Sequence, residues 1–147
     1  MIQIIKASNG NLEQLVELAL ELWPNNDYEL LKSEFVYIIG HLNNIVYLSK
    51  SDNEEYIGFI HMSIRSGFVE GADTTPVGYV EGIYVKPNFR MKGVAKELYD
   101  AGAEWVKSKK CTQIGADIGL HNDMCPGFYI SMGFNEVNRI ICYINNI

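Results

Sequence analysis

The six residues from Arg90 to Ala95 combine two basic side chains with a glycine, and they precede a helical pattern. The first backbone N–H groups of a helix have no partner within it, and the helix dipole favours an anion there. Gly93 would let a ligand approach the backbone, Ala95 is too small to block it, and Arg90 and Lys92 add mobile positive charge. The segment therefore predicts a pyrophosphate cradle, although these residues alone equally allow an ordinary helix start. Neither GxxxxGK[ST] nor GxGxxG occurs, which excludes a P-loop or Rossmann site.

Two acidic residues stand at positions where a carboxylate has a cost. Glu81 interrupts an apolar strand pattern, and alternation would place it on the same side of the strand as Ile83 and Val85. Asp117 is a lone acid near the end of the predicted strand 114–118. A buried carboxylate must be paired or must act on something. Glu81 is therefore a candidate base or anchor for a cationic amine, with a salt bridge as the alternative.

The apolar pattern predicts the elements that must position these residues. Strands are predicted at residues 2–6, 45–49, 56–65, 78–85, 114–118 and 137–144, and helices at 12–22, 28–39, 91–110 and 126–132. The order β-α-α-β-β-β-α-β-α-β indicates an α/β domain with a mixed sheet. We expect this single domain to occupy residues 1–147.

Composition narrows the classes of partner. A net charge of −6, from 12 basic and 18 acidic side chains, repels phosphate backbones and attracts cations. Nucleic acid is therefore not expected as a partner, and a small polycation suits the surface better. No apolar run approaches the length of a membrane span, so we expect a cytoplasmic protein without a membrane partner. The cysteines form no CxxC pair, and no metal site is expected.

Two signatures resemble those of the GNAT superfamily of N-acetyltransferases. The pattern Pro87-x-x-Arg90-x-x-Gly93-x-Ala95-x-x-Leu98 is similar to the one that binds the pyrophosphate of coenzyme A. Asn122 lies seven residues before Tyr129, which stands four before Gly133-Phe134, as in the family's second signature. The resemblance covers essentially the whole chain. It implies the GNAT fold, an α/β (α+β) fold whose central mixed, mostly antiparallel twisted sheet is flanked by helices.

The resemblance also implies acetyl-CoA as cofactor and direct attack of an amine on the thioester. The backbone N–H of Val85 would polarise the carbonyl, and the Tyr129 hydroxyl would protonate the departing sulfur. The strand before the cradle would bulge and splay from its neighbour, exposing backbone groups to the pantetheine arm. The cofactor-binding residues implied are Ile83, Tyr84, Val85, Arg90, Met91, Lys92, Gly93, Val94, Ala95, Asn122 and Tyr129.

Within the superfamily, the stretch from Ser63 to Val85 is most similar to the aminoglycoside 6′-N-acetyltransferases. That similarity implies a homodimer, a role in antibiotic resistance and the 6′-amine of an aminoglycoside as acceptor. The catalytic residues implied are Glu81 and Tyr129, and the substrate-binding residues are Trp23, Phe68, Glu81 and Asp117. Aromatic and acidic groups are what an ammonium-bearing sugar requires.

Two other functions stay open at this point. The same acidic pocket could serve an acetyltransferase for polyamines or another small cationic amine. A non-catalytic acyl-CoA-binding module could use the same scaffold, although the presence of Glu81 and Tyr129 argues against it. A fold does not by itself determine the acceptor.

Overall fold

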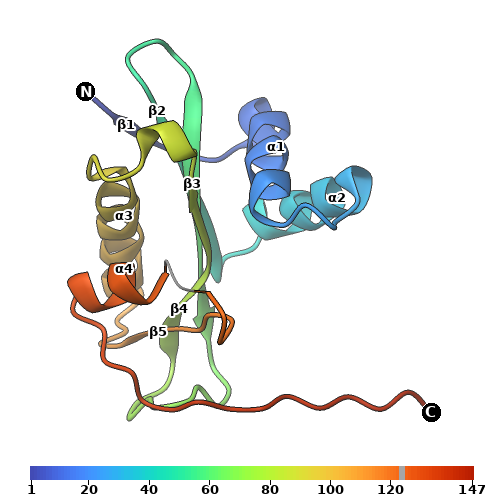
Figure 1. Ribbon diagram of the computed structural model, residues 1–147, viewed down its shortest axis with the longest axis vertical. Helices are drawn as coiled ribbons and strands as arrows, with labels where there is room; N and C mark the ends of the chain where they lie inside the picture. The colour runs from blue at the N-terminus through green and yellow to red at the C-terminus, as the bar shows by residue number, and fades with distance from the viewer. Residues whose placement is uncertain (123–124) are drawn as a thin grey trace.

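A five-stranded sheet with helices on both faces forms the body of the protein (Figure 1). The computed structural model describes residues 1–122 and 125–147. The strands are β1 (Gln3–Lys6), β2 (Asn44–Lys50), β3 (Tyr56–Arg65), β4 (Val77–Val85) and β5 (Ile114–Ala116). The helices are α1 (Leu12–Leu22), α2 (Tyr28–Ile39), α3 (Val94–Ser108) and α4 (Cys125–Ser131), with short 3-10 turns at Asn9–Asn11 and Pro87–Phe89.

The strands lie in the order β1-β2-β3-β4-β5, with every neighbouring pair antiparallel except the parallel pair β4 and β5. Helices α1 and α2 cover one face of the sheet, and α3 and α4 lie on the other (Figure 1). The mixed, mostly antiparallel sheet predicted from the resemblance is confirmed. No described helix is both long and apolar enough to cross a membrane.

The α1–α2 face is covered because α1 presents one continuous apolar stripe. Leu15, Val16 and Ala19 are fully buried and pack with residues of α2, β2 and β3. Helix α1 ends at its C-cap residue, Trp23, because the proline that follows disfavours helical backbone before it. Asp27 starts α2 by accepting a hydrogen bond from a first-turn backbone N–H.

The α3 face is held by a second apolar cluster. Val94, Leu98 and Val106 of α3 are buried against residues of β3 and β4. Helix α3 is shorter than the predicted span 91–110, because both Met91 (φ 62°) and Gly93 (φ 84°) adopt left-handed backbone that cannot continue a helix. The segment 91–93 is therefore a turn that leads into the helix.

The predicted last strand, 137–144, is wrong. The chain after α4 is extended and runs along the end of the sheet and past it, without pairing to any described strand (Figure 1). An apolar segment forms a strand only where another strand supplies hydrogen bonds, and the described part of this chain supplies none there. The side chains of Ile141 and Ile144 are 78% and 94% exposed as a result.

Candidate active site

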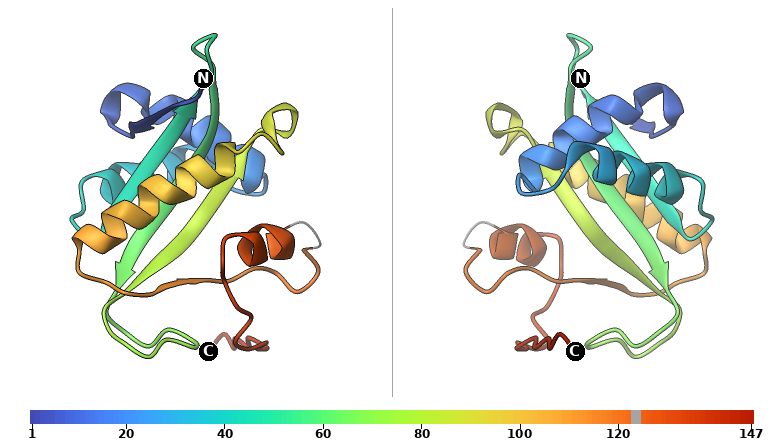
Figure 2. Two further views of the ribbon diagram at one scale, coloured as in Figure 1. Left: turned by 90° about the vertical axis from the view of Figure 1, so that its left-hand side faces the viewer. Right: turned by 90° about the vertical axis from the view of Figure 1, so that its right-hand side faces the viewer.

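Strands β4 and β5 separate partway along their length and leave an open edge on β4. β5 pairs only with Gly78, Tyr79 and Val80, and Figure 2 shows the two strands diverging beyond that point. The Lys86 N–H bonds to the Ile57 carbonyl of β3. Backbone groups of neighbouring strand residues point to opposite edges, so those of Val85 and of Ile83 point into the opening. The splay implied by the resemblance is present, but Tyr84 turns its backbone toward β3.

The cradle segment stands at the end of this open edge. Gly93 caps α3 with φ 84°, and a Cβ added to it would meet nothing within 4 Å. The space beside Gly93, at the N-terminus of α3, is therefore open. Arg90 is not the mobile charge that the sequence suggested, because its Nε donates to the Val85 carbonyl oxygen at 2.7 Å. That bond joins the cradle to the end of β4.

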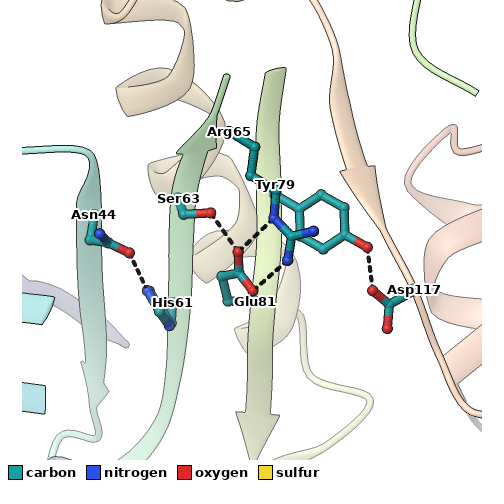
Figure 3. Close-up of polar contacts among 7 residues, drawn as sticks. All are labelled: Asn44, His61, Ser63, Arg65, Tyr79, Glu81 and Asp117. Carbon is teal, nitrogen blue, oxygen red and sulfur yellow. Dashed lines mark hydrogen bonds and ion pairs between the residues drawn. The ribbon is translucent and has the colours of Figure 1, made fainter. Parts of the chain in front are cut away.

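Hydrogen bonds from Ser63 and Arg65 hold the Glu81 carboxylate (Figure 3). Its Oε1 accepts from the Ser63 hydroxyl at 2.6 Å and from Arg65 Nε at 2.9 Å, and its Oε2 accepts from Arg65 Nη2 at 2.8 Å. Burial acts to raise the pKa of Glu81, but the bonds from Arg65 and Ser63 and the nearby positive charge hold this pKa below its usual value. Glu81 is therefore an ionised, fully engaged carboxylate in this state.

The alternation that placed Glu81 with Ile83 and Val85 is wrong. His61 of β3 pairs with Gly82, but the next residue of β3 pairs with the residue before Glu81, so Glu81 is the extra residue of a β-bulge. The bulge turns both Glu81 and Gly82 toward α1 and α2, whereas Ile83 and Val85 pack in the core under α3. The apolar neighbours of the sequence pattern are thus on the other face of the sheet.

Asp117 joins the same face through Tyr79. The Tyr79 hydroxyl donates a hydrogen bond to Asp117, and the Arg65 guanidinium lies 3.4 Å from the centre of the Tyr79 ring. Burial, with the bond to Asp117, raises the pKa of Tyr79 well above its usual value. Two carboxylates, one aromatic ring and one guanidinium therefore form a continuous network from β3 to the end of β5 (Figure 3).

Trp23 borders this network and Phe68 does not contact it in any described interaction. A Cβ added to Gly82 would lie 2.6 Å from the Trp23 ring, so this ring covers β4 directly beside Glu81. Phe68 lies on the loop between β3 and β4 and its side chain is 88% exposed. Three of the four predicted substrate residues, Trp23, Glu81 and Asp117, are brought to one face of the sheet.

Tyr129 lies on the other side of the opening. Its ring packs against the apolar cluster under α3, with its centre 5.1 Å from that of Phe134 and 5.2 Å from that of Phe128. Asn122 is exposed, and its backbone N–H bonds to the Gly119 carbonyl. The two predicted catalytic residues, Glu81 and Tyr129, therefore lie on opposite faces of the sheet, with the β4–β5 opening between them.

Sequence reasoning gave no site role to the polar residues of β3 that organise this face. His61, Ser63 and Arg65 stand two residues apart, which places all three on the α1–α2 side, so the period-two pattern carried the signal. His61 shares a hydrogen bond of 2.8 Å with Asn44. Burial lowers the pKa of His61 to about 4, although the charge of Glu81 opposes the shift.

Within residues 1–122 and 125–147, no cluster of His, Cys, Asp or Glu could hold a metal ion.

An open strand edge, an anion cradle at its end and a cation-binding network behind it can hold two different molecules. An anionic, extended ligand would lie along β4 with its phosphates at α3. A cationic ligand would lie between Trp23, Glu81 and Asp117. The two ligands would meet where β4 and β5 part.

The model of the acetyltransferase (GNAT) family matches residues 12–134. Aminoglycoside N(6′)-acetyltransferase type 1 of Salmonella enteritidis is 33% identical over 142 residues, which cover 95% of this chain and 96% of the relative. The enzyme of the same name from Acinetobacter baumannii is 29% identical, and 98% of each chain is covered.

A solved structure of AAC(6′)-Iy in complex with the bisubstrate analogue CoA-S-monomethyl-acetylneamine matches with a TM-score of 0.95 at 30% identity. The match covers 100% of this chain and 99% of that one. The chain therefore belongs to the acetyltransferase (GNAT) family and, within it, to the group of the type 1 aminoglycoside N(6′)-acetyltransferases.

Proposed function

We propose that this protein transfers the acetyl group of acetyl-CoA to the 6′-amine of an aminoglycoside, and so confers resistance to such antibiotics. The observation that carries the proposal is the near-complete match to AAC(6′)-Iy, which holds a single molecule joining coenzyme A to an aminoglycoside. The cytoplasm, where acetyl-CoA is formed, is the compartment in which we propose that it acts. This chain has the two halves that such a molecule needs, a cradle at α3 and an acidic, aromatic face behind β4.

In the proposed reaction, coenzyme A lies along the open edge of β4 with its pyrophosphate on the first N–H groups of α3. The N–H of Val85, which points into the opening, donates to the thioester carbonyl oxygen and stabilises the negative charge that develops there. The aminoglycoside nitrogen attacks the carbonyl carbon from the Glu81 side. The C–N bond forms, the C–S bond breaks, and the sulfur leaves as a thiolate.

Tyr129 is proposed to protonate that thiolate. Its ring packs on the α3 side of the opening, which is the side of the cradle and hence of the cofactor. The amine must also lose a proton before or during attack. Glu81 is the nearest candidate to receive it, but both of its oxygens are bonded to Arg65 in this state. We therefore propose that Glu81 first attracts the ammonium, and that it can serve as base only once Arg65 has moved away.

A panel of acceptors tests this function. We expect thiol release from acetyl-CoA with kanamycin and tobramycin, at a kcat/KM at least roughly tenfold above that for spermidine or a lysine peptide. A rigid sugar presents its ammonium groups at fixed positions, whereas a flexible chain loses conformational entropy on binding. The product should carry its acetyl group on the 6′-nitrogen by mass spectrometry. Rapid acetylation of spermidine with none of kanamycin would instead make the protein a polyamine acetyltransferase. Binding of acetyl-CoA without thiol release in the presence of any acceptor would indicate only acyl-CoA binding.

We further propose that the protein is a homodimer in which the extended tail of each copy pairs with the other. The root of the tail is anchored, since Val137 packs on Gly71 and the Asn138 side chain donates to Glu70. Beyond that root, four large apolar residues are 66–94% exposed, which is costly for a continuous apolar run: Ile140, Ile141, Tyr143 and Ile144. Among the described residues, β5 pairs with β4 alone, so its other edge is unpaired. A cavity of about 410 Å³ lies beside β5.

Removal of residues 139–147 tests this pairing. We expect light scattering to give a dimer for the full chain and a monomer for the truncated one. Removal of Asn145–Ile147 alone is the control and should leave the dimer intact. A monomeric full chain, or a truncated chain that stays dimeric, would contradict the tail exchange without affecting the acetyl-transfer proposal.

A further inference from the structure

Arg65 occupies a position with all the features of a binding site for a substrate cation. Its guanidinium makes two parallel bonds to Glu81 and lies 3.4 Å from the centre of the Tyr79 ring (Figure 3). The Tyr79 hydroxyl in turn bonds to Asp117. An aromatic face beside a carboxylate is an environment that binds the ammonium group of a ligand. In the free protein this environment is filled by the chain's own arginine.

The pair is also built to come apart. The Arg65 side chain is 40% exposed and that of Glu81 is 26% exposed, so the guanidinium can swing into water without leaving a buried cation behind. Glu81 would remain in place after such a movement, because the Ser63 hydroxyl bonds to it independently at 2.6 Å.

We propose that Arg65 is an internal substitute for the substrate's cation, which an acceptor must displace from Glu81 in order to bind. This inference rests on the acetyl-transfer function proposed above and adds a rule of selectivity to it. With Arg65 in place, the two carboxylates and the guanidinium leave the free site with one net negative charge. An acceptor with a single ammonium gains little by replacing a bidentate arginine, whereas one with several ammonium groups can occupy Glu81 and Asp117 together.

The displacement also links binding to proton transfer. Burial of Glu81 acts to raise its pKa, and Arg65 is the main group that opposes this. Departure of Arg65 therefore makes Glu81 a stronger base at the moment when an amine arrives beside it. In the absence of acceptor, Arg65 keeps the carboxylate ionised and engaged.

Calorimetric titration of the protein saturated with coenzyme A tests the substitution. The probes are kanamycin, which carries several ammonium groups, and 6-amino-6-deoxyglucose, which carries one. Arg65→Gln should bind the single-charge sugar roughly five- to tenfold more tightly than the parent, because the competing cation is gone. Kanamycin affinity should rise by a similar factor, because both amines must displace the same guanidinium from Glu81. Arg65→Lys, which keeps the charge but loses the two-point bond, should lie between the parent and Arg65→Gln.

Two controls separate this effect from others. Lys107→Gln removes one positive charge from an exposed ion pair on α3 and should alter neither affinity, which excludes a general effect of net charge. In a Glu81→Gln background, Arg65→Gln should no longer tighten the binding of either amine.

A loss of affinity for both amines in Arg65→Gln would mean that the arginine only positions Glu81, and it would overturn the inference while leaving acetyl transfer intact. A parent protein that neither binds nor acetylates kanamycin would instead remove the proposed function and the inference together.

Discussion

Gly93 is the residue at which the cradle can be tested most directly. Its φ of 84° is a left-handed conformation, which costs any residue with a Cβ roughly 1–2 kcal/mol and a β-branched residue more. Space is not the obstacle, since an added Cβ would meet nothing within 4 Å of it. Gly93→Ala should therefore lower Tm by roughly 2–8 °C through strain alone. Gly93→Val adds further strain and also bulk at the N-terminus of α3.

Gly133 provides a matched control, because its φ is 92° and an added Cβ there also meets nothing within 4 Å. Gly133→Ala should cost a similar amount of stability but leave coenzyme A affinity near that of the parent. Gly93→Val should bind coenzyme A roughly 10- to 100-fold more weakly, because one or two charge-assisted bonds from backbone N–H groups to the pyrophosphate are lost. Calorimetric titration measures both variants. Equal affinity for coenzyme A in Gly93→Val and the parent would refute the cradle.

Three further predictions follow from the site. Tyr129→Phe should leave acetyl-CoA affinity unchanged and lower kcat by ~10²–10⁴, as for a lost general acid, when single-turnover kinetics isolate the chemical step. Asp117→Asn should chiefly raise the KM for kanamycin, and more so at low salt, as steady-state rates at two ionic strengths would reveal. His61→Gln should flatten the dependence of stability on pH. Burial lowers the pKa of His61 from 6.5 to about 4, so the unfolded chain takes up the extra proton first as pH falls. The parent should then lose about 3 kcal/mol of stability between pH 6.5 and 4, and the variant less, in urea titrations.

The sequence determined the elements whose formation depends on neighbouring residues. The apolar stripe of α1, the proline after Trp23 and the cap at Asp27 are local signals, and the first two helices follow them closely. Gly93 is a local signal too. A glycine before a helix indicates that a ligand can approach the backbone there, and this predicted the cradle. The family signatures then identified the cofactor, because pyrophosphate binding depends on one short contiguous segment.

The tertiary structure alone decided which residues share the face of the sheet that we propose to bind the acceptor. The bulge at Glu81 shifts the alternation of β4 by one residue, and a bulge depends on how β3 and β4 pair rather than on the sequence of either strand. It turns Glu81 toward Ser63 and Arg65, which the sequence had given no role. The strand predicted at residues 137–144 is wrong because strand formation also depends on pairing. Its apolar residues favour a strand, but a strand exists only with a partner, and a partner is a property of the assembled fold.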